Sequence, residues 1–144
     1  LVRRLLAETN LASMPLADGT EITTALLAPT RIYVKTVLPL IQAGLIHGAA
    51  HITGGGFEDN VPRMLPKTLA AAFDAEAWQW PELFTRLQQA GDLSMATMRR
   101  TFNCGIGMVL AVAKKDVATV LAQNPHSQVI GEVIDRTQDA VVWR

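Results

Sequence analysis

The sequence predicts an α+β domain in which a mixed β-sheet is covered by helices. Segments with helical and strand patterns alternate along the chain, and the last two strand candidates, residues 128–134 and 140–143, are close enough to pair as a hairpin at a sheet edge. The chain has 144 residues, 49% of them apolar, which suffices for one hydrophobic core. Because no repeat or linker-like stretch divides it, we expect a single domain over residues 1–144.

The chain is predicted to open with a helix. Val2, Leu5 and Leu6 recur at helical spacing, and Asn10 is suited to ending this helix. Residues 12–24 combine proline, aspartate and glycine, so we expect a loop there.

A second helix is predicted to begin at Pro29, because proline suits a first turn, and to stop at Gly44. Pro39 lies inside this pattern and removes one backbone donor, so we expect a kink or an early end. Residues 45–52 are short, mostly apolar and flanked by glycine, which predicts a buried strand. A short helix is expected over residues 57–65.

The remaining elements are predicted from local signals. Apolar runs indicate the strands, whereas a proline at a first turn, a serine cap and glycine stops mark the ends of the helices. The further expected strands are residues 68–73, 106–112, 128–134 and 140–143. The further expected helices are residues 81–90, 95–100 and 115–123.

Composition excludes several classes of partner. Basic and acidic residues balance at 13 each, which argues against nucleic acid, because phosphate binding requires a basic excess. The single cysteine, Cys104, fits a reducing compartment such as the cytoplasm. The longest mostly apolar stretch, residues 37–50, is shorter than the roughly 20 residues of a membrane helix, so we expect no membrane partner. Since the chain begins at Leu1 rather than methionine, we expect a piece of a longer protein.

The most unusual feature is the run HITGGGF at residues 51–57. Consecutive glycines cost conformational entropy, so a strand-to-helix junction that keeps them needs backbone freedom or close approach by another group. Free N–H groups at such a junction attract anions, and Thr53 can add a hydroxyl. Asn60 and Arg63 follow three residues apart, and arginine can hold phosphate or carboxylate with two N–H groups. The alternative is a tight turn beside a surface arginine.

Two more segments are candidates for ligand binding. Arg31 and Lys35 lie four residues apart on the expected second helix, a like-charge pair that a bound anion or an acidic partner would relieve; the alternative is two solvated cations. Gly105 and Gly107 enter the clearest strand and leave room for a backbone or a ligand, although a helix stop and a bulge are the favoured explanation. We interpret Cys104 as a buried structural thiol.

The histidines and aromatic residues give weaker signals. His47 and His51 are four residues apart, which on a strand is about 13 Å, so we do not expect a shared metal ion. Trp78, Trp80 and Phe84 are expected to anchor a core or an interface.

Together, these stretches resemble the C-terminal domain of the aminoimidazole ribonucleotide (AIR) synthetase family. The similar blocks are LLAPTRIYVK (26–35), HITGGGFEDNVPRMLP (51–66), AWQWPELFTRLQQAG (77–91) and TFNCGIGM (101–108), in the family's order and spacing. Residues 123–144 share only a general similarity. The first two blocks favour AIR synthetase over related enzymes such as selenophosphate synthetase and thiamine-monophosphate kinase.

The resemblance implies an ATP-dependent cyclo-ligase of purine biosynthesis that converts formylglycinamidine ribonucleotide (FGAM) to AIR. ATP phosphorylates the formyl-amide oxygen, the amidine-side nitrogen attacks that carbon, and phosphate leaves as the ring closes. The resemblance also implies a partner N-terminal domain that builds a homodimer and supplies most contacts to ATP and Mg²⁺. The isolated C-terminal domain is therefore expected to be inactive.

Within this chain, we expect a phosphorylated substrate to be bound by backbone N–H, hydroxyl, amide and cationic groups. The principal residues are Thr53, Gly54, Gly55, Gly56, Asn60 and Arg63. The secondary residues are Arg31, Lys35, His51 and Asn103. No general base is identified. Two alternatives stay open: a non-catalytic binding or oligomerisation module, and the matching domain of a related ATP-dependent kinase or synthetase.

Overall fold

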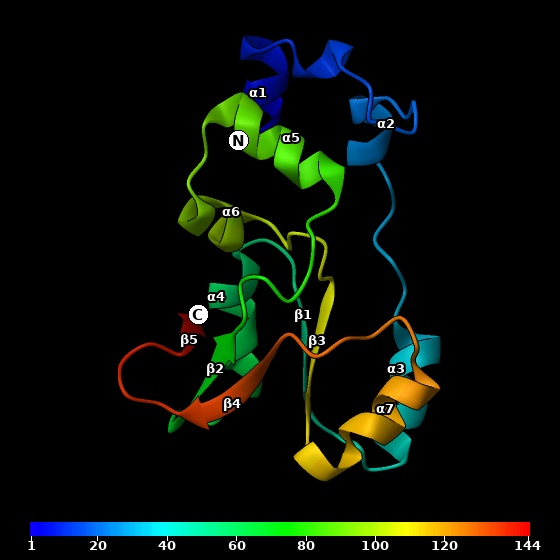
Figure 1. Ribbon diagram of the computed structural model, residues 1–144, viewed down its shortest axis with the longest axis vertical. Coiled ribbons are helices and arrows are strands. Elements are labelled where there is room, and N and C mark those ends of the chain that lie inside the picture. The colour runs from blue at the N-terminus through cyan, green and yellow to red at the C-terminus, as the bar shows by residue number, and fades with distance from the viewer.

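The computed structural model describes residues 1–144 and confirms the α+β class (Figure 1). Its strands are β1 (Ile46–His51), β2 (Leu69–Phe73), β3 (Met108–Val112), β4 (Gly131–Asp135) and β5 (Val141–Trp143). Its α-helices are α1 (Val2–Glu8), α2 (Ile22–Leu26), α3 (Val34–Gln42), α4 (Gly56–Asn60), α5 (Glu82–Gly91), α6 (Met95–Thr101) and α7 (Val117–Gln123). Short 3₁₀ turns are η1 (Leu11–Ser13), η2 (Val61–Met64) and η3 (Lys114–Asp116).

The strands form two sheets rather than one. β1 and β3 make an antiparallel pair, whereas β2 is the centre of a three-stranded mixed sheet, antiparallel to β4 and parallel to β5. The expected hairpin between residues 128–134 and 140–143 is therefore wrong, because β2 lies between β4 and β5. Residues 70–73 of β2 are all buried, and a buried strand needs hydrogen-bond partners on both edges.

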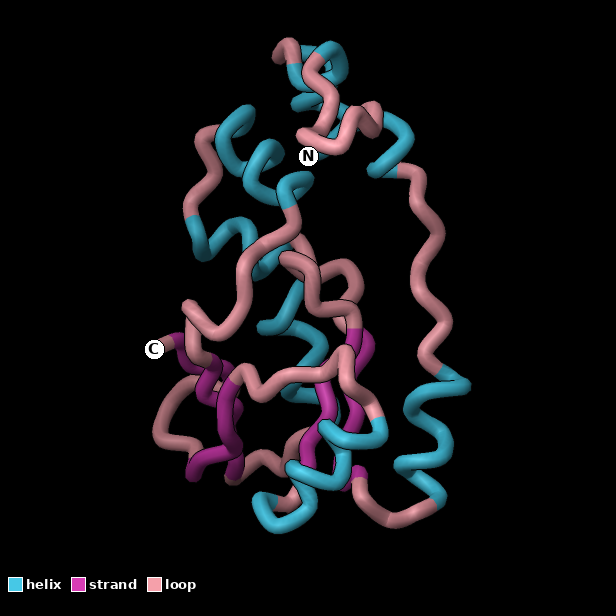
Figure 2. The backbone as a smooth tube through the Cα atoms, turned by 45° about the vertical axis from the view of Figure 1, so that its right-hand side comes forward, coloured by secondary structure: helices cyan, strands magenta, loops and turns pink.

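Two hydrophobic cores hold the chain together. One joins the two sheets to α4, and the rings of Phe57, Phe73, Trp78 and Trp143 pack in it edge-to-face or tilted, with centroids 5.1 to 6.2 Å apart. The other joins α1, α2 and α5, and Phe84 packs against it. The helices of this second core gather at one end of the molecule, away from the strands (Figures 1 and 2). Trp78 and Phe84 thus anchor cores, as expected.

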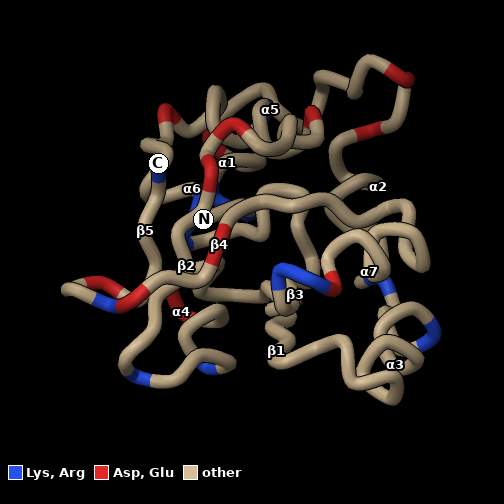
Figure 3. Tube along the Cα trace, turned by 60° about the horizontal axis from the view of Figure 1, so that its bottom comes forward, with Lys and Arg blue, Asp and Glu red and all other residues tan.

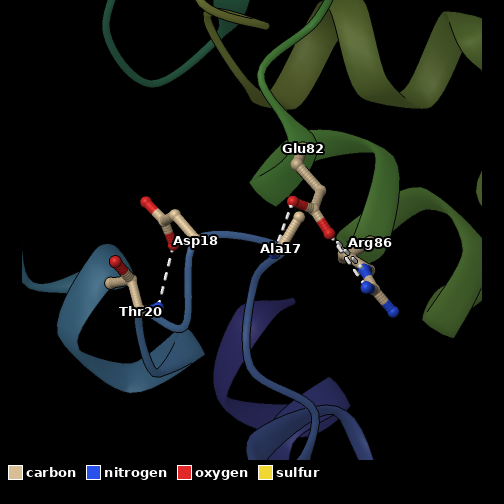
Figure 4. Close-up of polar contacts among 5 residues, drawn as sticks. All are labelled: Ala17, Asp18, Thr20, Glu82 and Arg86. Atoms are coloured by element: carbon tan, nitrogen blue, oxygen red, sulfur yellow. Dashed lines mark hydrogen bonds and ion pairs between the residues drawn. The ribbon is translucent and has the colours of Figure 1, made fainter.

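The N-terminal loop is attached to α5 by one carboxylate (Figure 4). Glu82 accepts a hydrogen bond of 2.8 Å from the backbone N–H of Ala17 and pairs with Arg86 at 2.9 Å. Donation by Ala17 is the main reason that the pKa of Glu82 lies below its usual range. The predicted loop is confirmed over most of its length, but the short helix α2 begins inside it at Ile22.

The second predicted helix begins later than expected. Residues 28–33 have no regular structure, and α3 starts at Val34, so the placement of Arg31 and Lys35 on one helix face is wrong. The residue before a proline disfavours the helical region, and Tyr33 packs against the sheet instead of continuing a helix. α3 does not end at Pro39, while Gly44, at φ +70°, terminates it as predicted.

The elements with clear capping signals are confirmed. Pro81 directly precedes α5, and the Ser94 hydroxyl accepts a hydrogen bond from the N–H of Thr97 at the start of α6. β1 lies where it was expected, but only Ala50 in it is buried, because a two-stranded sheet leaves much of its surface to solvent. No helix has both the length and the apolar character needed to cross a membrane.

Candidate functional site

The glycine run forms the turn between β1 and α4. Gly55 and Gly56 adopt φ values of +90° and +60°, a region that favours glycine. A Cβ atom on Gly56 would lie 2.8 Å from the carbonyl carbon of Arg99, and closer still to its oxygen. Both reasons expected for the glycines, backbone freedom and close approach, are therefore confirmed. The approaching group is the last turn of α6.

The Asn60 side chain stabilises this turn through hydrogen bonds. Its side chain is buried, and its amide nitrogen donates to the carbonyl oxygens of Gly56 at 2.7 Å, Gly54 at 3.2 Å and Thr53 at 3.4 Å. Because the amide N–H groups face backbone carbonyls, the observed role of Asn60 is to position the glycine turn. Its direct contact with a substrate stays a prediction.

A hollow of about 300 Å³ opens beside this turn. Its lining residues are Ala49, Ala50, His51, Thr53, Asn60 and Arg63. Arg63 is exposed and forms no ion pair, and the backbone N–H groups of Gly54 and Gly55 donate to no group of the protein. The structure thus brings four of the predicted residues, among them the free cation Arg63, together around one space, and the free N–H groups of Gly54 and Gly55 belong to the adjoining turn. Such a set can bind an anion.

Arg31 and Tyr33 do not line this hollow but a second cavity, although Tyr33 also contacts His51, which does line the hollow. The Arg31 guanidinium lies 5.6 Å from the centre of the Tyr33 ring, and that ring meets His51 edge-on at 5.9 Å between centroids. Tyr33 fills the space that Gly107 leaves open, where a Cβ atom would lie 3.0 Å from Cζ. The room predicted at Gly107 is real, but a side chain occupies it. That glycine was the available signal for Tyr33.

Asn103 and Lys35 do not line the hollow either. The Asn103 side chain accepts a hydrogen bond of 3.0 Å from the N–H of Gly105 and shapes the turn before β3. This turn adjoins the glycine run, because the N–H of Ile52 donates to the carbonyl of Gly107 at 2.9 Å. Lys35 is exposed on α3 and lines no part of the hollow.

The last turn of α6 packs against the glycine turn. Besides meeting Gly56, Arg99 places its guanidinium 4.0 Å from the centre of the Trp143 ring, a cation–π contact that sequence spacing does not reveal. Cys104 is completely buried, and burial raises the pKa of its thiol to about 12. The prediction of a structural thiol is confirmed, because a protonated, inaccessible sulfur is no nucleophile.

A second cavity, of about 290 Å³, lies between β3 and residues 124–133. Its lining is mostly apolar, and two of its polar side chains, Asn124 and Ser127, are hydrogen-bonded to each other. Arg31 is the only one of the predicted site residues that lines it, whereas four line the hollow at the glycine turn, so that hollow is the better candidate for an anionic ligand.

Comparison with known protein families decides the relationship. Residues 1–144 match the family described as AIR synthase related protein, C-terminal domain. The chain belongs to this family. AIR synthase related proteins include several ATP-using enzymes, and in this C-terminal domain the glycine turn, which Asn60 positions, lies beside the free guanidinium of Arg63.

Proposed function

We propose that this chain is the C-terminal domain of the ATP-dependent cyclo-ligase that converts FGAM to AIR in purine biosynthesis. The observation that carries the proposal is the exposed, unpaired guanidinium of Arg63 beside Thr53 and the free N–H groups of Gly54 and Gly55. The first two sequence blocks, residues 26–35 and 51–66, support the cyclo-ligase over other AIR synthase related enzymes.

In this proposal, the hollow binds and orients the phosphorylated substrate. Arg63 pairs with an anionic oxygen, while the Thr53 hydroxyl and the Gly54 N–H donate to the same group. Ring closure by an amidine nitrogen needs positioning and charge stabilisation rather than a protein nucleophile. The burial of Cys104 agrees with a site of this kind.

The residues of this chain do not fit a metal site of their own. No three His, Cys, Asp or Glu side chains gather in an arrangement that could hold a metal ion. Following the family resemblance, we propose that ATP and Mg²⁺ are bound mainly by an N-terminal domain, as part of a cytoplasmic homodimer. The C-terminal domain contributes the substrate-binding side of a cleft between the N-terminal and C-terminal domains.

The test is an assay of the reconstituted enzyme. The chain is combined with the N-terminal domain and supplied with FGAM, ATP and Mg²⁺, and AIR formation is followed. Production of AIR only when both halves are present supports the proposal. ATP-dependent phosphorylation of another acceptor assigns the chain to a related kinase or synthetase instead. If titration calorimetry finds no FGAM binding to the chain, with or without the N-terminal half, the hollow is not a substrate site.

A further inference from the structure

The end of α6 is joined to the C-terminal strand by an arginine that forms no ion pair. The guanidinium of Arg99 is half-buried and lies 4.0 Å from the centre of the Trp143 ring. Burial lowers the pKa of this guanidinium, because a partly desolvated cation is unfavourable. Tryptophan is the aromatic residue whose ring face attracts a cation most strongly, so the Trp143 ring compensates for the missing carboxylate. Figure 3 shows the basic end of α6 on the side of the molecule where β5 and the C-terminus lie.

The pairing of β5 with β2 holds Trp143 in place. The next residue, Arg144, donates its N–H to the carbonyl of Phe73 at 2.9 Å and accepts a hydrogen bond of 3.0 Å from the N–H of Ala75. The Trp143 ring packs against the rings of Phe57 and Phe73, with centroids 5.2 Å apart in both pairs. Its Nε1–H is buried without a hydrogen-bond partner, which is unfavourable. The contacts of its ring, and not its N–H group, therefore account for a tryptophan at this position.

Arg99 also contacts the glycine turn through its backbone. A Cβ atom on Gly56 would lie 2.8 Å from the carbonyl carbon of Arg99, so the last turn of α6 directly touches the start of α4. The residue after Gly56 is Phe57, whose ring meets the Trp143 ring. The start of α4 is thus in contact with the α6 backbone and with the Trp143 ring, and the Arg99 side chain joins these two contacts to each other.

We propose that Arg99 and Trp143 form a clamp that positions the glycine turn, and with it the free N–H groups of Gly54 and Gly55, for anion binding at the hollow. Asn60 transmits the position of α4 to the turn, because its amide donates to three of the carbonyl oxygens there. Arg99 lines no part of the hollow and is a positioning residue. The link to substrate binding rests on the proposed function, whereas the clamp rests on contacts within the chain.

The clamp gives the C-terminal segment a part in the site. Residues 123–144 share only a general similarity with the AIR synthetase family, and β5 lines no part of the hollow. Through the contact between Trp143 and Arg99, this strand nevertheless acts on the position of the donors at the glycine turn.

Amide hydrogen exchange in the 144-residue chain tests the clamp without any ligand. The N–H of Gly56 donates to the carbonyl of Thr53 at 3.0 Å, so its exchange rate reports opening of the turn. Arg99→Gln should accelerate this exchange about three- to tenfold, and Arg99→Lys, which keeps a cation, should restore most of the protection. Arg4→Gln is the matched control, because Arg4 is an exposed arginine of α1; its exchange rate at Gly56 should stay within about twofold of the unmodified chain.

A double-mutant cycle determines whether Arg99 acts through Trp143. Trp143→Leu removes the aromatic face, so Arg99→Gln should have little further effect on Gly56 exchange in that background. If Trp143→Leu does not fold, Trp143→Phe replaces it, and the effect of Arg99→Gln should then be reduced, because phenylalanine attracts a cation less strongly. In the reconstituted enzyme, Arg99→Gln should raise the KM for FGAM about three- to tenfold and leave kcat within about twofold, since the clamp positions groups that bind substrate.

Three outcomes overturn the proposal. The first is an unchanged exchange rate at Gly56 in Arg99→Gln. The second is a double variant in which the separate effects of Arg99→Gln and the Trp143 substitution simply multiply. The third is faster exchange with an unchanged KM for FGAM, because the turn then opens without consequence for binding. Absence of AIR formation by the unmodified enzyme is a separate result: it removes the proposed function, while the exchange rates still decide on the clamp.

Discussion

Replacing Gly56 with alanine should destabilise the protein much more than the same change two residues earlier. At Gly56, the φ of +60° costs an alanine about 1–2 kcal/mol. The new Cβ would also lie 2.8 Å from the carbonyl carbon of Arg99 and 3.0 Å from that of Arg100, an overpacking that costs about 1–3 kcal/mol. The sum, about 2–5 kcal/mol, is a large fraction of the 5–15 kcal/mol that stabilises an ordinary domain.

Gly54 is the matched control within the same run of glycines. A Cβ atom there meets nothing within 4 Å, and its φ lies outside the left-handed region. Gly54→Ala should therefore leave the free energy of unfolding unchanged or raise it by up to about 1 kcal/mol.

Urea unfolding followed by tryptophan fluorescence measures both variants. The midpoint for Gly56→Ala should fall by roughly 1–2 M, with no change in the slope m. Equal midpoints for the two variants, or a loss below about 1 kcal/mol for Gly56→Ala, would refute the assignment of Gly56 to the contact with α6.

Three further predictions concern the site, the N-terminal loop and the thiol. Arg63→Ala should raise the KM for FGAM at least about tenfold in the full enzyme without changing Tm, because the side chain is exposed; an unchanged KM makes Arg63 an ordinary surface residue. The pKa of Glu82 is lower in the folded protein, so the stabilisation it gives is complete above its ordinary pKa of 4.5 and is lost as the pH falls through the folded value. In Glu82→Gln, the urea midpoint should therefore fall less steeply with decreasing pH than in the unmodified protein. An identical pH dependence would contradict the role of the hydrogen bond from Ala17 to Glu82. Cys104, with its pKa raised to about 12, should resist iodoacetamide at neutral pH and react only after unfolding; rapid labelling of the folded protein would contradict its burial.

Local signals in the sequence predicted the helices that carry clear caps. Pro81 and Ser94 mark helix starts by chemistry that acts within a few residues, so α5 and α6 lie where they were expected. Pro29 is a weaker signal, since proline fits both a first helical turn and an extended segment. Packing of Tyr33 against Gly107 and His51 decides between these conformations, and that contact joins residues far apart in sequence.

Strand pairing was the part of the fold least accessible to sequence. Neighbouring strands often form a hairpin, which favoured pairing of β4 with β5. The apolar run of β2, with Ala70 and Phe73 at either end of its buried part, requires two neighbours, and the two C-terminal strands supply them. The sequence of residues 128–143 alone does not indicate that its two strands pair with β2 on opposite edges.

The glycine turn could be identified as a candidate site from the sequence, but the separate roles of its three glycines could not. The run of three glycines predicted an anion site, and the structure gives each glycine a different task. Gly55 supplies a left-handed turn before α4, and Gly56 admits the α6 backbone, so both serve the fold first. Gly54, with open space around it, is the glycine whose N–H a ligand can approach most freely. If Gly54→Ala leaves stability intact but raises the KM for FGAM, the ligand lies on the side of the turn that faces Arg63.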